Sequence, residues 1–383
     1  MMDFPKTADI VVIGGGIVGV ATAYYLAKSG RKNVVVLEKN TVCSGSTGRC
    51  GAGIRAQWGL ELNCRMALAC LDTFEQLDDE LGLPTGLNQA GYLLVAYKDK
   101  EWEQFQKNVV LQHSLGINTE IFTDKKRAQE ICPGVAVDDA LGFTFYNRDG
   151  HADPFLTTFA FQEAAKRLGV TFCKFTEVTG LKVEGGKITE VETNKGNISC
   201  GTVVNCAGSW AQDIAKMAGI NLPNWAERHE IIITEPVDPG VCPPMLMSFS
   251  GNYYIQQRPH GSIIAGESPS HEPLLGYTST PHSIASIARI VLKMLPRAKD
   301  IRVVRQWAGH YDMTPDAAPI LGQTDVSGFW HATGFSGHGF MLGPVAGQIM
   351  TSLLNGEKPF IDPSIMDYHR FERGEKIIEP SVV

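Results

Sequence analysis

A glycine-rich turn near the N-terminus constrains the fold more than any other feature of the chain. Residues 9–13 form a β-branched run, which is typical of a central parallel strand. Gly14, Gly16 and Gly19 follow in the G-x-G-x-x-G spacing, and residues 20–27 then predict a helix. The order of strand, glycine turn and helix predicts the first half of a Rossmann-like unit that binds a dinucleotide.

A second strand and its terminal acid complete this unit. Residues 33–37 form another buried β-branched run, and Glu38 ends it. In such a site the first glycine makes the tight turn, the second lets a pyrophosphate approach the backbone, and the third lets the helix pack against the sheet. The N–H groups at the helix start attract the phosphates. Glu38 can accept hydrogen bonds from ribose hydroxyls, and its charge would repel a 2′-phosphate. NADP is therefore disfavoured, while FAD and NAD both stay open.

Composition and charge exclude several other classes. The chain is 44% hydrophobic and 20% charged, which allows a large core and excludes wholesale disorder. Its net charge of −7 argues against a dedicated binder of nucleic acid or anionic membranes. The 9 cysteines include no C-x-x-C pair, so no zinc ribbon or other metal site is predicted, and their odd count favours reduced thiols in a cytoplasmic protein. The apolar run over residues 10–27 contains three consecutive glycines, so it predicts a strand and a helix and no transmembrane segment.

Two later glycine-rich segments favour FAD over NAD. A long Gly/Ser/Thr loop lies within residues 37–55, where a nicotinamide-dependent dehydrogenase would have another plain helix. Residues 329–340 form a second strand-to-helix junction, ahead of a helix over residues 343–354. Both segments can follow a second half of the cofactor, and an NAD enzyme would leave the late junction without a role. A flavin hydroxylase would carry a Gly-Asp pair, which the chain lacks.

Together with several shorter motifs, these segments carry a family resemblance. The chain resembles the flavin-dependent amine oxidoreductases of the D-amino-acid oxidase, glycine oxidase and sarcosine oxidase superfamily over nearly its whole length. Beyond the N-terminal unit, the motifs are Gly45-Ser46-Thr47, Glu177-Val178, residues 205–208, Thr314-Pro315-Asp316 and residues 334–340. The segments most similar to the catalytic β subunits of dye-linked L-proline dehydrogenase and heterotetrameric sarcosine oxidase are residues 49–55, 152–154, 307–311 and 368–374.

The resemblance implies an α/β fold, α+β overall, with two domains. A Rossmann-like FAD-binding domain is expected from three discontinuous segments, residues 1–85, 151–220 and 321–383. A second domain, an antiparallel sheet that roofs the flavin and shapes the substrate site, is expected from residues 86–150 and 221–320. Runs such as residues 230–234 and 253–256 predict strands of this second sheet.

The resemblance also implies which residues bind FAD. Glu38 takes the adenosine ribose, the backbone of Val178 takes the adenine, and the segments around Thr47 and Gly339 lie along the flavin. The expected FAD-binding residues are Gly14, Gly16, Ile17, Gly19, Glu38, Lys39, Gly45, Ser46, Thr47, Arg49, Gly51, Val178, Ala207, Gly208, Gly334, Gly337, His338, Gly339 and Phe340.

The chain lacks the two residues through which relatives attach flavin covalently. Relatives with covalent flavin carry a cysteine where Gly309 stands, or a histidine at the position of Gly48-Arg49, so non-covalent FAD is expected. Heterotetrameric sarcosine oxidases tether an interfacial FMN to a histidine, and Ala152 replaces it here. His151 is adjacent but one position out of register, so an FMN at a subunit interface is left open.

Four residues are candidates for the chemistry. Arg55 falls where sarcosine oxidases place an arginine, and its planar guanidinium suits a carboxylate. Met341 replaces a lysine of monomeric sarcosine oxidases, so a single cationic anchor is expected. Tyr254 and Tyr311 are candidate hydroxyls over the substrate, and His338 lies in the late glycine motif. Each tyrosine also has an ordinary interpretation as a core side chain.

The implied function is FAD-dependent oxidation of the C–N bond of a small, secondary amino acid, of the L-proline or sarcosine type, to the imine. Ile264 stands where monomeric sarcosine oxidases have an oxygen-activating lysine. We therefore expect a dehydrogenase that passes electrons to an α-type electron-transfer subunit. The alternatives are a glycine or sarcosine oxidase that makes hydrogen peroxide, a subunit of an opine or hydroxyproline dehydrogenase, and, in a different class, a non-catalytic subunit that carries flavin.

Overall fold

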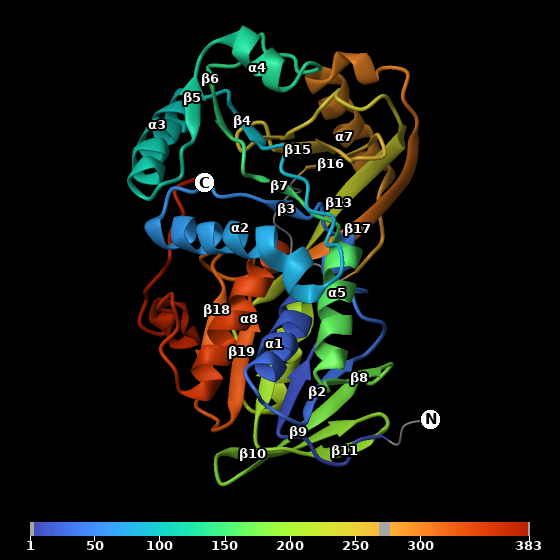
Figure 1. Ribbon diagram of the computed structural model, residues 1–383, viewed down its shortest axis with the longest axis vertical. Coiled ribbons are helices and arrows are strands. Elements are labelled where there is room, and N and C mark those ends of the chain that lie inside the picture. The colour runs from blue at the N-terminus through green and yellow to red at the C-terminus, as the bar shows by residue number, and fades with distance from the viewer. Residues whose placement is uncertain (1–3, 268–275, 382–383) are drawn as a thin grey trace.

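The computed structural model describes residues 4–267 and 276–381, and two large sheets organise them (Figure 1). Six strands form the sheet in the lower half of that view, in the order β18-β19-β12-β1-β2-β8. All neighbours pair in parallel except β18, which is antiparallel to β19. The strands predicted over residues 9–13 and 33–37 are β1 and β2. The six strands are β1 (Ile10–Ile13), β2 (Val34–Glu38), β8 (Thr171–Lys174), β12 (Val203–Asn205), β18 (Ile320–Gln323) and β19 (Phe329–Thr333).

Three helices cover one face of this sheet: α1 (Ile17–Lys28), α5 (Pro154–Arg167) and α8 (Gly339–Asn355) (Figure 1). Nearly every residue of α1 is buried because the helix lies between α5, α8 and the sheet. Gly347 lets α1 and α8 approach closely, since a Cβ there would lie 2.8 Å from the backbone nitrogen of Thr22. The opposite face of the sheet packs against α6 and a small antiparallel sheet. These elements are α6 (Ala211–Met217), β9 (Val178–Glu184), β10 (Lys187–Thr193) and β11 (Gly196–Ser199).

An eight-stranded sheet forms the other half of the molecule, in the order β17-β13-β16-β15-β14-β4-β6-β5. The runs predicted over residues 230–234 and 253–256 lie in β13 and β15. The sheet is not wholly antiparallel as expected, because β14 and β4, from separate segments of the chain, pair in parallel. The strands are β4 (Tyr92–Ala96), β5 (Glu120–Phe122), β6 (Gly142–Tyr146), β13 (Trp225–Pro236), β14 (Met245–Ser248), β15 (Tyr253–Gln257), β16 (Ser262–Glu267) and β17 (Val303–Met313).

The remaining elements connect or flank the two sheets. α2 (Glu61–Leu81) crosses the middle of the molecule and packs against α8, whereas α3, α4 and α7 flank the eight-stranded sheet (Figure 1). Among the helices of the described residues, none is long and apolar enough to cross a membrane. The other bounds are α3 (Asp99–Ser114), α4 (Lys125–Ile131), α7 (Pro281–Met294), β3 (Gly53–Ile54), β7 (Gly150–His151), and the 3-10 turns η1 (Thr47–Arg49), η2 (Gly208–Trp210), η3 (Pro296–Ala298), η4 (Ser364–Met366) and η5 (Tyr368–Arg370).

This architecture confirms the predicted fold class. A Rossmann-like sheet is assembled from discontinuous segments, and a second sheet comes from the segments between them. The residue boundaries given above for the two domains stay predictions. Residues 1–3 and 382–383, at the outer ends of the predicted FAD-binding domain, lie outside the described residues.

A buried ion pair fixes the C-terminal segment to the six-stranded sheet. The side chains of Asp316 and Arg370 are both 0% exposed. Arg370 donates from Nε and Nη2 to the two carboxylate oxygens, at 2.8 and 2.9 Å, and also from Nη2 to the Ala318 carbonyl. The N–H of Ile377 donates to Asp316 Oδ2 at 3.0 Å. Both carboxylate oxygens of Asp316, the acid of the Thr-Pro-Asp motif, therefore bond to the C-terminal segment.

Replacing Arg370 by leucine should lower the free energy of unfolding by about 3–5 kcal/mol, because it leaves a buried carboxylate without its partner. Urea titration of the purified protein measures this loss. Arg373→Leu is the matched control, since its ion pairs with Asp367 and Glu375 are exposed and should contribute less than about 1 kcal/mol. Equal losses in the two variants would contradict a special contribution of the buried ion pair between Asp316 and Arg370 to stability.

Candidate active site

The carboxyl ends of β1, β2 and β12 open onto a cavity of about 380 Å³, which strands of the eight-stranded sheet close from the other side. Ligands of open parallel sheets bind at this end of the strands. The predicted residues that line the cavity are Gly14, Gly16, Ile17, Glu38, Lys39, Gly45, Ser46, Thr47, Arg49, Gly51, Arg55, Val178, Ala207, Gly208, Tyr254, Tyr311, Gly337, His338, Gly339 and Phe340. Two predicted residues, Gly19 and Gly334, are not among the lining residues.

At three predicted glycines a side chain would not fit. Gly14 has a φ of +113°, and a Cβ there would overlap the carbonyl oxygen of Cys206 at the end of β12. A Cβ on Gly19 would overlap the carbonyl oxygen of Gly14, so Gly19 supports the turn from within α1. Gly334 has a φ of +75°, and its N–H donates to Asp312 Oδ2 at 2.5 Å. These positions require glycine for the packing of the chain itself.

The N-terminus of α1 faces the cavity without a cap from its own N-cap residue. Gly16 is the N-cap residue and supplies no side-chain hydrogen bond, while the N–H of Ile17 donates to Thr47 Oγ1 at 3.1 Å. A Cβ on Gly45, in the same loop as Thr47, would meet no atom within 4 Å. An uncapped helix start carries a partial positive charge and outward N–H groups. This part of the cavity therefore suits a pyrophosphate.

Glu38 and Lys39 lie at the end of β2. The backbone holds the Glu38 carboxylate, because Gly15 N–H donates to Oε2 and Asn40 N–H donates to Oε1, both at 2.8 Å. Each carboxylate oxygen keeps a further lone pair for a ribose hydroxyl. The Lys39 ammonium lies 3.4 Å from the ring centre of Trp210, and burial lowers the pKa of Lys39.

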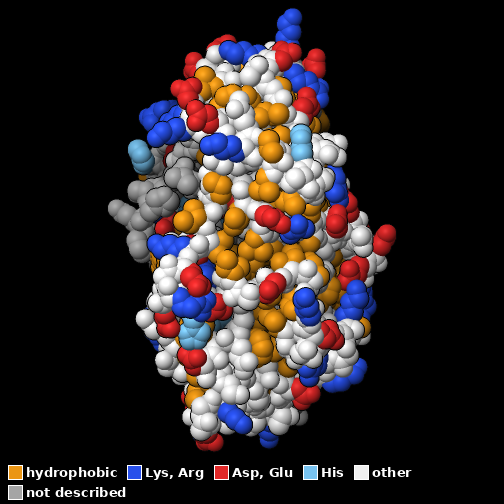
Figure 2. Space-filling model, turned by 90° about the vertical axis from the view of Figure 1, so that its left-hand side faces the viewer, with side chains coloured by type: hydrophobic (Ala, Val, Ile, Leu, Met, Phe, Trp, Pro, Cys, Tyr) orange, Lys and Arg blue, Asp and Glu red, His pale blue; other side chains and the backbone are white. Residues whose placement is uncertain are grey.

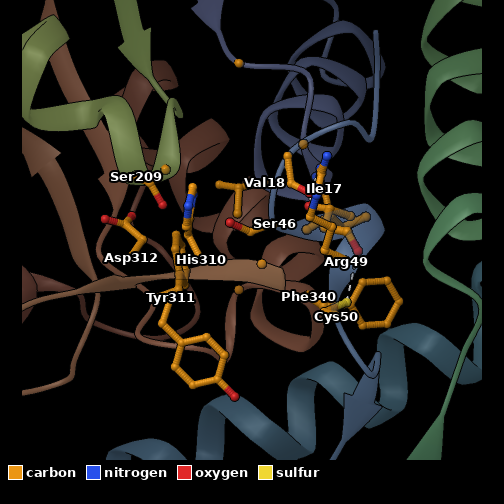
Figure 3. A pocket seen from close by; sticks show the side chains of 18 of the residues that line it. Ile17, Val18, Ser46, Arg49, Cys50, Ser209, His310, Tyr311, Asp312 and Phe340 are labelled. Atoms are coloured by element: carbon orange, nitrogen blue, oxygen red, sulfur yellow. Dashed lines mark hydrogen bonds between the residues drawn. The ribbon is translucent and has the colours of Figure 1, made fainter. Parts of the chain in front are cut away.

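Two buried polar atoms in the middle of the cavity lack a partner within residues 4–267 and 276–381: Ser209 Oγ and His310 Nδ1. Both residues line the cavity and are labelled in Figure 3. Burial lowers the pKa of His310, so its ring is neutral at physiological pH. Buried polar atoms in proteins are nearly always hydrogen-bonded. Ser209 Oγ and His310 Nδ1 can therefore form hydrogen bonds with a large polar ligand in the cavity.

The two predicted tyrosines pack against the glycine segments at the far end of the cavity. A Cβ on Gly51 would lie 3.1 Å from Tyr254 Cε2, and one on Gly337 would overlap the ring of Tyr311. Figure 3 shows Tyr311 and His310, neighbours on β17, projecting to opposite sides of the strand. Tyr311 therefore reaches the far end of the cavity while His310 remains in its middle.

Arg55 is a buried cation at this far end. It is 3% exposed, and its guanidinium lies 4.2 Å from the ring centre of Trp58 and 5.1 Å from that of Phe249. Its Nη1 is 3.9 Å from Met247 Sδ, and no carboxylate of the described chain forms an ion pair with it. Burial lowers the pKa of Arg55, which reflects the cost of keeping the charge away from water. Such a guanidinium is a binding site for an anionic group that enters the cavity.

His338 lies beside Arg55 and is neutral. Its ring packs edge-on against Trp58 with 4.6 Å between ring centres, and burial, followed by the Arg55 charge, lowers its pKa to about 3. Burial raises the pKa of Tyr311 to about 12 and raises that of Tyr254 above its ordinary value. At neutral pH these three side chains are therefore uncharged hydrogen-bonding groups around one cation.

Comparison with known proteins identifies the family. Residues 9–353 match the FAD dependent oxidoreductase family, DAO. The sarcosine oxidase β subunits of Rhodobacter capsulatus and Arthrobacter sp. are 27% and 29% identical to this chain over 98% of its length, and the matches cover 91% and 93% of those subunits. The crystal structure of L-proline dehydrogenase from P. horikoshii is 37% identical, with a TM-score of 0.93, and the match covers 98% of this chain and 100% of that one.

This chain belongs to the FAD dependent oxidoreductase family. Membership confirms the predicted superfamily, the predicted enzyme class and FAD as the cofactor. The cavity fits that cofactor at three points: the acid at the end of β2, the start of α1 without an N-cap side chain, and the unpartnered polar atoms of Ser209 and His310. We therefore expect Glu38, the α1 N-terminus and the segments around Gly51 and Gly337 to hold FAD.

An aromatic wall over the middle of the cavity was not predicted from the sequence. The Arg49 guanidinium lies 3.8 Å from the ring centre of Tyr277, and Tyr277 stacks on His310 with 4.5 Å between ring centres. Trp210, which lies beside Lys39, was also not predicted. Trp210 follows the predicted glycine motif that ends at Gly208, and that position could have indicated it. No motif marks Tyr277, which lies in a loop.

The contact of Gly14 with β12 predicts a specific loss of FAD. Gly14→Ala should abolish FAD binding, because the new Cβ overlaps the Cys206 carbonyl and displaces the turn that starts α1. The absorbance ratio of flavin to protein after purification, and titration of the apoprotein with FAD, measure the effect. Gly30→Ala is the matched control, since its φ is +98° but a Cβ there meets no atom within 4 Å. It should cost about 1–3 kcal/mol of stability and retain FAD; loss of FAD in both variants would contradict the assignment.

Proposed function

We propose that this FAD-dependent oxidoreductase oxidises the C–N bond of a small, secondary amino acid, of the L-proline or sarcosine type, to the imine, with hydride transfer to flavin N5. The observation that carries the proposal is Arg55, a buried guanidinium on the cavity wall without a carboxylate partner in the described chain. An amino-acid carboxylate presents two oxygens that match the guanidinium fork. The names of the sarcosine oxidase subunits and of L-proline dehydrogenase support this substrate class.

The residues around Arg55 suit a small, partly apolar substrate. Bound FAD supplies the acceptor for two electrons and a hydrogen from the carbon next to the amine. Arg55 fixes the carboxylate, and the buried Met245, with Met247, forms an apolar wall that keeps water from the reacting carbon. Tyr254 and Tyr311 are neutral phenols at this end, so each can exchange a hydrogen bond with the substrate while adding no charge.

Ile264 stands on β16 where an oxygen-activating lysine would be expected, and this favours a dehydrogenase over an oxidase. Ile264 is 8% exposed in the middle of β16, and its side chain offers no charge to stabilise reduced oxygen. We therefore infer that electrons leave for a partner subunit of the electron-transfer type. Figure 2 shows hydrophobic side chains gathered across the middle of one face, with charged side chains around them. α3 and the C-terminal segment lie on that side in Figure 1, and carry Val110 and Ile378, which are 73% and 67% exposed.

The alternatives differ in acceptor, substrate or catalysis. A glycine or sarcosine oxidase would pass electrons to oxygen, an opine or hydroxyproline dehydrogenase subunit would take a larger or hydroxylated substrate, and a flavin-carrying subunit would not turn over any amine. An interfacial FMN, which the sequence left open, is a separate point. His151 is 1% exposed, with Arg258 at 2.9 Å from its Nδ1 and Asn88 at 3.2 Å from its Nε2, so both ring nitrogens are already engaged. We therefore propose FAD as the one flavin held by this chain, and a cytoplasmic location stays a prediction.

Arg55→Met should reduce kcat/KM for the best amino acid by about thirtyfold or more, because truncating one partner of a buried charge pair costs about 2–5 kcal/mol. Anaerobic bleaching of the flavin by L-proline, sarcosine, glycine, hydroxyprolines and opines identifies the substrate. Arg305→Met is the control, since Arg305 also lies near a tryptophan but is exposed on β17. Bleaching by none of these compounds would overturn the amine proposal, and full activity in Arg55→Met would overturn the anchor.

The acceptor can be tested separately. After anaerobic reduction by substrate, the flavin should be reoxidised rapidly by an artificial dye and only slowly by dissolved oxygen. Stopped-flow absorbance measures both rates, and extraction followed by chromatography should find FAD without FMN. Rapid reoxidation by oxygen with hydrogen peroxide as product would establish the oxidase alternative.

A further inference from the structure

The pairing of two short strands brings an acid to the base of the Arg55 segment. β3 and β7 are antiparallel, with Gly53 opposite His151 and Ile54 opposite Gly150. Continuing the register by one residue places Arg55, directly after β3, opposite Asp149, directly before β7. Opposed residues of antiparallel strands have their Cβ atoms only about 5 Å apart. Asp149 and Arg55 are therefore neighbours although they lie far apart in the chain.

Asp149 bonds to the segment that follows Arg55 and leaves the guanidinium free. Asp149 is 0% exposed, and its Oδ1 accepts the N–H of Ala56 at 2.7 Å while its Oδ2 accepts Nε2 of Gln57 at 2.9 Å. Gln57 extends the connection into the eight-stranded sheet. Its Nε2 also donates to the Tyr92 carbonyl at 3.1 Å, and its Oε1 accepts the Thr144 hydroxyl at 2.7 Å. The loop that carries Arg55 is thus fastened to β4 and β6 through one buried carboxylate.

We propose that Asp149 is the positioning residue for Arg55, and that its negative charge weakens the binding of a substrate carboxylate when it is ionised. The inference rests on the proposed role of Arg55 as the carboxylate anchor. A bound carboxylate cancels the Arg55 field that otherwise stabilises ionised Asp149. The two anions then share one buried cation, so substrate binding and protonation of Asp149 favour each other.

The groups that face Asp149 support this coupling. They are Arg55 at the end of β3, Arg148 next to it in the turn, Tyr92 on β4 and Tyr146 on β6. Burial is the largest influence and raises the pKa of Asp149 to about 7, against the lowering by its hydrogen bonds and by the two arginines. Burial keeps the pKa of each of the two tyrosines above its usual value, so neither phenol ionises near neutral pH.

The test is the pH dependence of binding of an amine-free carboxylate to the FAD-loaded protein. Cyclopentanecarboxylate is suitable because it stays ionised above pH 6, and the flavin absorption spectrum reports its binding. If the like charge shifts the pKa by about one unit, the dissociation constant of the native protein should rise by up to about tenfold between pH 6 and pH 8.5. Asp149→Asn, which cannot ionise, should show a dissociation constant that does not change over this range.

Two controls separate this inference from the proposed function. Asp72→Asn removes an exposed acid that pairs with Arg148, and should keep the native pH profile. Arg55→Met should lose binding at every pH; if it binds as the native protein does, the anchor itself is wrong. If Arg55→Met loses binding but Asp149→Asn keeps the native profile, the anchor stands and the role of Asp149 is refuted.

A measurement on the native protein covers the case in which Asp149→Asn does not fold. Binding of cyclopentanecarboxylate at pH 7 should take up a fraction of a proton. Calorimetry in two buffers of different ionisation enthalpy measures this uptake. Proton uptake supports the inference, and binding without proton uptake overturns it. With turning-over substrate, the Asp149→Asn change should appear in the pH profile of KM and leave kcat nearly unchanged.

Discussion

The cavity depends on the close approach of the start of α1 to the end of β12. Gly14 turns so tightly against the Cys206 carbonyl that any side chain there would overlap it, and Gly19 fits beneath the same turn. Gly347 of α8 then presses against α1 from the other side. The backbones of α1, α8 and the end of β12 approach one another at glycines, without side chains between them. The start of α1 is therefore fixed at the edge of the sheet. The pyrophosphate position that we expect follows from that placement and needs no charged side chain of its own.

The parts of the fold that could be predicted from the sequence are those that short segments encode locally. The β-branched runs that became β1 and β2, the turn at Gly14 and the acid Glu38 all act within one βαβ unit, so their spacing was sufficient. The late junction was predicted for the same reason, since β19 leads directly through a glycine turn into α8, although the helix begins at Gly339, earlier than the expected residue 343. The position of Arg55 relative to the cavity came only from the family resemblance.

Features that depend on pairing between distant segments could not be predicted in this way. The parallel pairing of β14 with β4 joins strands whose sequences show only that each is apolar. The stacking of Tyr277 on His310 requires a loop to fold over β17, and no local pattern encodes that. No motif in the sequence marks Asp149; only the register between β3 and β7 brings it to Arg55.

The arrangement of these two buried charges argues for function over stability. A direct ion pair between Arg55 and Asp149 would have offset part of the cost of burying both. Instead Asp149 accepts hydrogen bonds from Ala56 and Gln57, and the guanidinium lies between two aromatic rings and a thioether. An arginine neutralised by its neighbour would have little attraction left for a ligand. Because the acid bonds to the backbone of the same loop, it can fix the position of Arg55 and leave the guanidinium donors for the substrate carboxylate that we propose.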